Sequence, residues 1–299
     1  IIFINGIDKE NANYVATMDA FRKMFGRKIA TMHTPIMEGN KMQGYVSIIS
    51  SKAYLFTKGG RNEIAIPDDL VGQVKAIKNG LIEAAAESSD ELLDKYFSEG
   101  TLSNDEIIEG IKAGVKTGDT VPVMGGSAIQ NMGVINLMNE IVALLPSAAE
   151  KPPVVAEDGA GNPVEVGCDE NGPFAAQVFK TVVDPFVGKL NILRVFRGRL
   201  KSGMTVYNAV TGERERINQL YVLRGKKQDA VDELSAGDIG AVNKLISTNT
   251  GDTLCDENAK VKFDAIHFPR PVYSMAVYAD KKGEEDKIFG GLNKLSEED

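Results

Sequence analysis

The sequence predicts an α/β fold followed by an all-β fold in one chain. Residues 1–147 alternate short apolar runs with segments whose apolar residues recur every three or four positions, which is the period of a helix with one buried face. Residues 174–267 lose that period and show short β-type runs separated by Gly-, Pro- and Asp-containing turns. Residues 148–173, rich in Gly, Asn and Pro, are expected to form an extended linker.

The α/β region begins with an unbroken apolar run at residues 1–4, which is typical of a strand buried in a parallel sheet. The next helix ends at Gly26, and a later one begins at a capping box formed by Ser103 and Glu106. The other expected elements are a helical region over about 69–97, a strand over 120–124 and a helix over 134–145. We interpret residues 1–147 as an α/β domain.

Three further segments complete the expected organisation. Residues 31–67 contain β-type runs with their own turns and are interpreted as an inserted β-rich subdomain. The strands within 174–267 are spaced as in a small closed barrel. Residues 268–299 show one strand over 272–278 and one amphipathic helix over 284–295, which cannot bury a core alone. This incomplete unit, together with a first residue that is not Met, predicts a piece of a longer protein.

Composition excludes several classes of protein. A chain with 43% hydrophobic and 25% charged residues is not disordered, collagen-like or a coiled coil. It contains no apolar run near the ~18 residues of a membrane span, so no membrane contact is expected. Cys168 and Cys255 are interpreted as reduced cytosolic thiols, and with His33 and His267 they show no metal-ligand spacing, so no metal site is expected.

Charge is unevenly distributed along the chain. The net charge is −8, but residues 174–267 hold 14 Lys or Arg and 11 Asp or Glu. The basic run consists of Lys189, Arg194, Arg197, Arg199 and Lys201. It could contact an RNA phosphate backbone, or it could be a solvated barrel exterior whose cations pair with Glu213 and Glu215. The sequence supports both interpretations equally.

The first candidate binding motif is the Asn5-Gly6-Ile7-Asp8 segment, directly after the first strand. An Asn side chain there could bridge two loops, and the Asp8 carboxylate could accept hydrogen bonds from the N1–H and 2-amino group of guanine. The alternative is an Asx turn in which Asn5 and Asp8 cap the following helix. Spacing alone favours this alternative, because the pattern is short and recurs at residues 249–252.

The second candidate is Gly125-Gly126-Ser127-Ala128, which also leaves a predicted strand and precedes a helix. Ligands of open α/β sheets bind at the carboxyl ends of the strands, so two polar loops at neighbouring strand ends are a stronger signal than one. The alternative is a turn permitted by glycine in which Ser127 or Asn131 caps the helix. Taken singly, this motif favours the alternative.

Together these motifs resemble those of elongation factor G and its paralogues, the translational GTPases. The family's guanine-recognition loop, Asn-Lys-x-Asp, stands here as residues 5–8, and its Gly-Ser-Ala loop as residues 126–128. The resemblance continues through 179–190, 199–203, 236–239, 250–255 and 269–272, where the chain reads FKTVVDPFVGKL, RLKSG, AGDI, TGDTLC and PRPV. The β-containing insert between the two loops is similar to that of elongation factor G and unlike that of the tRNA-delivering factors.

The resemblance implies a site, ligands and partners. Asn5, Asp8, Gly126, Ser127 and Ala128 would contact the guanine of GTP or GDP, whose Mg²⁺ would be bound by the full-length parent. The partner would be the ribosome, both its RNA and its proteins, with Arg194, Arg197, Arg199 and Lys201 as candidate RNA contacts. The implied function is that of a GTP-dependent factor in ribosomal translocation, in the cytoplasm and as a monomer. Residues 1–147 would be the C-terminal part of the P-loop GTPase domain, 174–267 the translation-factor barrel, and 268–299 the start of a ferredoxin-like third domain.

Two departures from the family pattern limit these expectations. Gly6 replaces the lysine whose stem, in the family, packs along the guanine. Nothing in the chain matches the phosphate-binding loop Gly-x-x-x-x-Gly-Lys-Ser/Thr or the Mg²⁺ ligands. We therefore expect no GTP hydrolysis and no tight nucleotide binding by this chain alone, and no catalytic residue within it. A ribosome-protection or peptide-release GTPase, or a non-hydrolysing ribosome-binding or assembly module with a decayed nucleotide site, are the alternatives.

Overall fold

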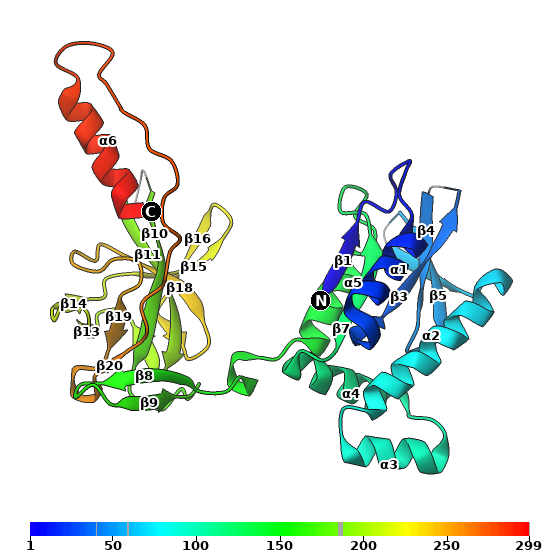
Figure 1. Ribbon diagram of the computed structural model, residues 1–299. Helices are drawn as coiled ribbons and strands as arrows, with labels where there is room; N and C mark the ends of the chain where they lie inside the picture. The colour runs from blue at the N-terminus through cyan, green and yellow to red at the C-terminus, as the bar shows by residue number, and fades with distance from the viewer. Residues whose placement is uncertain (40, 59, 185–187, 299) are drawn as a thin grey trace. The chain divides into compact units, whose positions relative to one another are not determined.

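A computed structural model describes residues 1–39, 41–58, 60–184 and 188–298 (Figure 1). The chain divides into two compact units, residues 1–146 and 147–299. Within the described residues, no helix is both long and apolar enough to cross a membrane. Pro185, Phe186 and Val187 of the predicted barrel motif, and Asp299, lie outside the described residues.

The first unit contains the predicted parallel sheet. Its strands are β1 (Ile2–Asn5), β7 (Val121–Gly126) and β2 (Ile29–Thr31), in the order β1-β7-β2, and both pairings are parallel. Helices α1 (Tyr14–Phe25) and α5 (Val134–Leu144) follow β1 and β7 respectively. β1 is only half-buried because it lies at the end of this sheet rather than at its centre.

The insert forms an antiparallel sheet of four strands, each paired with the next along the chain. The strands are β3 (His33–Glu38), β4 (Lys41–Ser47), β5 (Lys52–Thr57) and β6 (Gly60–Ile64). Successive strands pair because tight turns join them, which is the simplest connection for antiparallel neighbours. The sheet packs against the helical layer through a shared core that includes Val46, Ile48 and Leu81.

Three helices follow the insert: α2 (Asp68–Ala86), α3 (Asp90–Glu99) and α4 (Asn104–Thr117). The helical region predicted over 69–97 is divided, because the Ser89 side chain accepts a hydrogen bond from Leu92 N at 3.3 Å and starts a new helix. The capping box of Ser103 and Glu106 is present at the start of α4. Gly110 allows α4 to pack closely on α2, since a Cβ there would lie 2.5 Å from the Ala85 carbonyl oxygen.

The segment expected to be a linker is folded. It contains the 3₁₀ turn Ala148–Glu150, then β8 (Val154–Asp158) and β9 (Pro163–Val166), which pair with each other. β20 (Val261–Lys262) adds to β8, and Ala156, Val166 and Phe263 share a small core. The Gly- and Pro-rich composition marks the turns of this segment, and its strands form because β8 pairs with both β9 and β20.

The predicted barrel is present as a curled antiparallel sheet of eight strands in the order β14-β13-β19-β10-β11-β18-β15-β16. Its strands are β10 (Ala175–Asp184), β11 (Gly188–Arg197), β13 (Thr205–Asn208), β14 (Arg214–Arg216), β15 (Leu220–Arg224), β16 (Lys227–Val231), β18 (Ile239–Asn243) and β19 (Thr253–Cys255). β12 (Arg199–Lys201) and β17 (Glu233–Ser235) form a separate pair. Leu193, Leu200 and Leu254 belong to the core that this sheet encloses.

The end of the chain differs from the prediction. Residues 272–278, expected to be a strand, have no regular secondary structure, and Val272 is fully exposed. A strand needs a neighbour to complete its backbone hydrogen bonds, and no described segment supplies one here. The expected helix is present as α6 (Glu285–Glu298), which lies beside β10 and accepts a hydrogen bond at Glu298 Oε1 from Val183 N at 2.5 Å (Figure 1).

Candidate functional site

The two loops singled out by the sequence are joined in the structure. The Asn5 side chain Oδ1 accepts a hydrogen bond from Ala128 N at 2.9 Å. The Gly126 carbonyl oxygen accepts further bonds from Gly6 N at 3.0 Å and Ile7 N at 3.3 Å. This contact arises because β1 and β7 are parallel neighbours, so the loops that leave their carboxyl ends meet at one edge of the sheet.

The paired glycines of the second loop are required by close packing. A Cβ on Gly126 would lie 2.3 Å from the Met132 carbonyl oxygen and 2.6 Å from Phe3 Cζ. A Cβ on Gly125 would lie 2.8 Å from Tyr14 Cε2. Since side chains do not approach that closely, glycine is needed for the loop to reach Asn5.

Neither predicted helix-capping role is observed. The N-cap of α1 is Asn13, whose side chain accepts from Ala16 N at 2.9 Å, and not Asn5 or Asp8. Helix α5 begins after Gly133 without a side-chain cap. The buried Ser127 instead accepts a hydrogen bond from Gln130 N at 3.2 Å, which stabilises its own turn. The capping alternatives are therefore wrong for both motifs.

Asp8 is half-buried, and its carboxylate makes no hydrogen bond to a residue that the structure describes. A cavity of about 460 Å³ adjoins the loop and is lined by Asn5, Gly6 and Lys9, but not by Asp8 or by residues 126–128. The structure thus brings Asn5 together with the second loop and leaves the Asp8 carboxylate able to accept. It does not gather all five predicted residues in one cavity.

Gly6 has a left-handed backbone conformation, with φ of +76°. The Lys9 side chain lies over it, with Cε at 3.3 Å and Cδ at 3.5 Å from the position that a Gly6 Cβ would occupy. A lysine stem therefore covers this loop even though the family lysine is replaced by Gly6. Sequence reasoning missed Lys9, and the available signal was a lysine immediately after Asp8.

The basic residues of the barrel are largely engaged by other groups. Arg199 pairs with both Glu233 and Glu170, and Lys201 Nζ lies 3.1 Å from Glu233 Oε2. Arg197 Nε donates to the Pro173 carbonyl oxygen at 2.9 Å. Because the acceptors come from distant parts of the sequence, the local charge pattern could not reveal them.

Arg194 and Glu215 also differ from the expectation. The Arg194 guanidinium lies over the Phe196 ring at 5.4 Å, and its Nε is buried without a hydrogen-bond partner among the described residues. Glu215, expected to pair with barrel cations, is buried and accepts from Ser247 N at 2.8 Å and Ile246 N at 3.0 Å. Burial raises the pKa of this carboxyl, but the hydrogen bonds that it accepts outweigh that effect and hold the pKa below its usual value.

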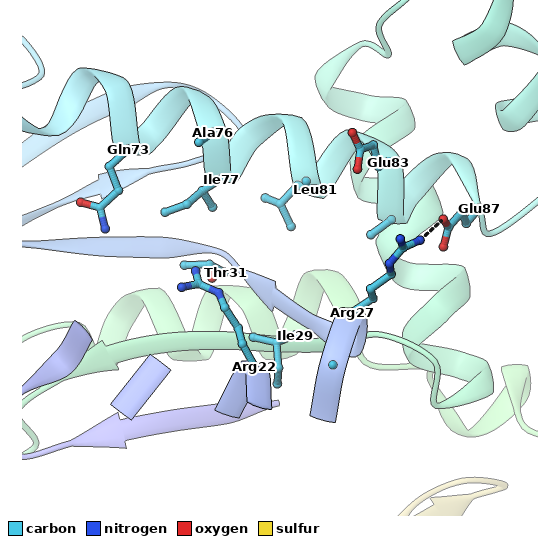
Figure 2. Close-up of a pocket in the computed structure, with 13 residues that line it drawn as sticks. Arg22, Arg27, Ile29, Thr31, Gln73, Ala76, Ile77, Leu81, Glu83 and Glu87 are labelled. Atoms are coloured by element: carbon cyan, nitrogen blue, oxygen red, sulfur yellow. Dashed lines mark ion pairs between the residues drawn. The ribbon is translucent and has the colours of Figure 1, made fainter. Parts of the chain in front are cut away.

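A larger cavity of about 660 Å³ lies elsewhere, between α2 on one side and α1 with β2 on the other (Figure 2). Gln73, Ile77 and Leu81 of α2 face Ile29 and Thr31, and an ion pair of 3.5 Å joins Arg27 to Glu87 at one end. No sequence-predicted site residue lines it.

Within the described part of the chain, no group of three or more His, Cys, Asp or Glu side chains is arranged to hold a metal ion.

Comparison with known proteins agrees with this architecture. Residues 173–257 match the family model of elongation factor G domain 2. The chain is 36% identical, over its whole length, to elongation factor G of Ureaplasma parvum serovar 3 and of Ureaplasma urealyticum serovar 10. A crystal structure of a Thermus thermophilus protein superposes with a TM-score of 0.84 at 28% identity and covers all of this chain.

An α/β unit followed by a curled antiparallel sheet, together with these matches, makes the chain similar to translation factors. More specifically, the chain is homologous to elongation factor G over its whole length, which confirms the resemblance predicted from its motifs. It spans 44% of the length of the curated relatives and 42% of the Thermus protein.

Proposed function

We propose that this chain supplies guanine recognition and a ribosome-contacting barrel to a GTP-dependent translation factor that promotes movement on the ribosome. The observation that carries the proposal is the hydrogen bond from Ala128 N to Asn5 Oδ1, because it fixes the two loops as one rigid edge. In this arrangement Asn5 positions the loops, Asp8 accepts from the base, and the Lys9 stem covers the loop beside Gly6.

Selectivity follows from the chemistry of Asp8. An ionised carboxylate only accepts hydrogen bonds, and guanine presents two adjacent donors, its N1–H and its 2-amino group. Adenine lacks this pair and would leave the carboxylate unpaired, which disfavours it. The Asp8→Asn amide would instead match xanthine, whose 2-oxo group accepts while its N1–H donates.

The test is nucleotide binding to the 299-residue chain by saturation-transfer NMR, which detects weak complexes. We expect GDP to bind more tightly than ADP, and Asp8→Asn to prefer xanthosine diphosphate to GDP. Asp94→Asn, on the exposed face of α3, is the matched control and should behave as wild type. Equal binding of ADP and GDP, or equal effects of the two substitutions, would refute the assignment.

The chain alone should not hydrolyse GTP, because phosphoryl transfer depends on positioned phosphates and Mg²⁺. A single-turnover GTPase rate above the buffer background for this chain would contradict that expectation. For the barrel, we propose Arg194 and Arg197 as the RNA contacts, because no described carboxylate neutralises them, whereas the more exposed Arg199 and Lys201 already pair with carboxylates. Salt-dependent co-sedimentation with ribosomes should weaken more for Arg194→Gln than for Lys201→Gln.

One observation favours a second candidate, a ribosome-binding or assembly module without nucleotide exchange. Gly6 stands where the family has a lysine, and its positive φ disfavours restoring one. Absence of guanine-nucleotide binding by the full-length parent, both with Gly6 and with Gly6→Lys, would favour this module.

A further inference from the structure

A separate small cavity lies between the insert sheet and helix α5, and residues 5–8 and 126–128 do not line it. It has a volume of about 210 Å³. The residues that matter for its chemistry are His33, Tyr45, Tyr54, Arg61, Asn136 and Glu140. The first four come from strands β3 to β6, and the last two lie one helical turn apart on α5, so tertiary packing alone brings them together.

Two polar side chains of this cavity are more than nine-tenths buried. His33 and Asn136 are each 8% exposed. His33 Nδ1 is buried without a hydrogen bond, and the Asn136 amide makes none to any described residue. Buried polar groups are almost always hydrogen-bonded, because an unpaired one costs about 1–3 kcal/mol. The unpaired His33 Nδ1, beside an Asn136 amide that bonds no described residue, indicates that the cavity can receive a polar group.

Two charges of opposite sign lie at the same cavity. The Arg61 guanidinium stands 4.3 Å from the centre of the Tyr54 ring and donates a hydrogen bond to the Tyr45 hydroxyl, which fixes its orientation. On the helix side, Glu140 Oε1 lies 3.5 Å from His33 Nε2, and burial raises the pKa of this carboxyl. Within the described residues, Arg61 and Glu140 form no ion pair with each other, so each charge remains available.

These groups select among ligand classes. A simple anion would be attracted by Arg61 but repelled by Glu140. A simple cation would be attracted by Glu140 but repelled by Arg61. The aromatic faces are not open to a cation, since Arg61 already lies over Tyr45 and Tyr54. A molecule that carries a negative and a positive group satisfies both charges at once.

We propose that this cavity binds a small dipolar molecule with one carboxylate and one ammonium group, the chemistry of a free α-amino acid. Its carboxylate would pair with Arg61, its ammonium with Glu140, and Asn136 and His33 would supply the remaining hydrogen bonds. The volume is below the ~300–1,000 Å³ of pockets for drug-sized ligands, which excludes a nucleotide. The proposal is independent of guanine binding.

The experiment is a saturation-transfer NMR screen of the 299-residue chain against the free L-amino acids, with acetate and ethylamine as single-charge probes. At least one amino acid should bind, and neither single-charge probe should. Glu140→Gln and Arg61→Gln should each weaken that binding about tenfold or more, as expected for loss of a charge-assisted hydrogen bond. Glu109→Gln and Arg27→Gln, at exposed positions outside the cavity, are the matched controls.

Far-UV circular dichroism of each variant separates loss of binding from loss of fold. If Glu140→Gln unfolds the chain, Asn136→Ala provides the second test and should weaken binding with the fold intact. Binding of acetate alone would overturn the dipolar assignment in favour of an anion site. Absence of binding by every amino acid, or equal binding by the cavity variants and their controls, would show that the cavity is only a packing feature.

Discussion

Gly6 is the position at which the structure makes the sharpest prediction. It occupies the centre of the Asn5–Asp8 loop with φ of +76°, a conformation that L side chains rarely adopt. The Cβ of Gly6→Ala would meet only the stem of Lys9, at 3.3 Å or more. Since Lys9 is exposed and flexible, it can move, so the backbone conformation is the dominant cost.

Placing an L residue in the left-handed region costs roughly 1–2 kcal/mol. We therefore expect Gly6→Ala to lower the free energy of unfolding by about 1–2 kcal/mol. Gly6→Asn should lower it by less than about 1 kcal/mol, because Asn tolerates this conformation. Gly6→Lys should behave as Gly6→Ala in stability, and its stem would compete with Lys9 for the same surface of the loop.

The assay is urea denaturation followed by far-UV circular dichroism, since the chain has no Trp for fluorescence. Gly72→Ala, at an open helical position, is the control for added side-chain volume. GDP binding by Gly6→Lys and by Gly6→Lys/Lys9→Ala then tests the competition, and we expect improved binding only in the double variant. Stability of Gly6→Ala equal to wild type, or equal losses for Ala and Asn, would refute the reasoning.

Three further predictions concern other parts of the chain. Glu215→Ala should lower the free energy of unfolding by about 2–4 kcal/mol at pH 7, because it removes the acceptor of buried donors. Since the pKa of this carboxyl is lowered in the folded state, wild type loses that stabilisation as pH falls, so the difference between the two proteins should shrink in acid denaturation. Burial lowers the pKa of His33 to about 4, so protonation favours the unfolded state and wild type should lose stability as pH falls from about 6.5 towards 4. A His33→Gln variant should lose less stability over the same pH range. Gly110→Ala should destabilise the folded chain by about 1–3 kcal/mol, and Gly80→Ala, with open space around it, should stabilise it by about 0.5–1 kcal/mol. A shift of the melting temperature in the same direction for both variants would contradict the packing argument.

Several features could be read directly from the sequence because their causes are local. The helix end at Gly26 and the capping box of Ser103 and Glu106 depend only on neighbouring residues. Periodicity identified the α/β region and the β-rich region for the same reason. Prediction failed at residues 272–278, because a β-type run becomes a strand only when another strand supplies hydrogen bonds. It also failed at residues 148–173, whose strands β8 and β9 depend on a third strand about a hundred residues later.

The sequence by itself therefore determined the order of fold types, the two loop motifs and the resemblance to elongation factor G, since these are properties of neighbouring residues and of residue identity. Only the tertiary structure decided that Asn5 bonds Ala128, that Lys9 covers Gly6, and that Arg199 pairs with Glu233. The contacts with Ala128 and Glu233 join residues far apart in the chain, and Lys9 covers Gly6 only because the loop turns back on itself. Burial and hydrogen bonding at such contacts are set by how the strands align, which a pattern of residues does not specify.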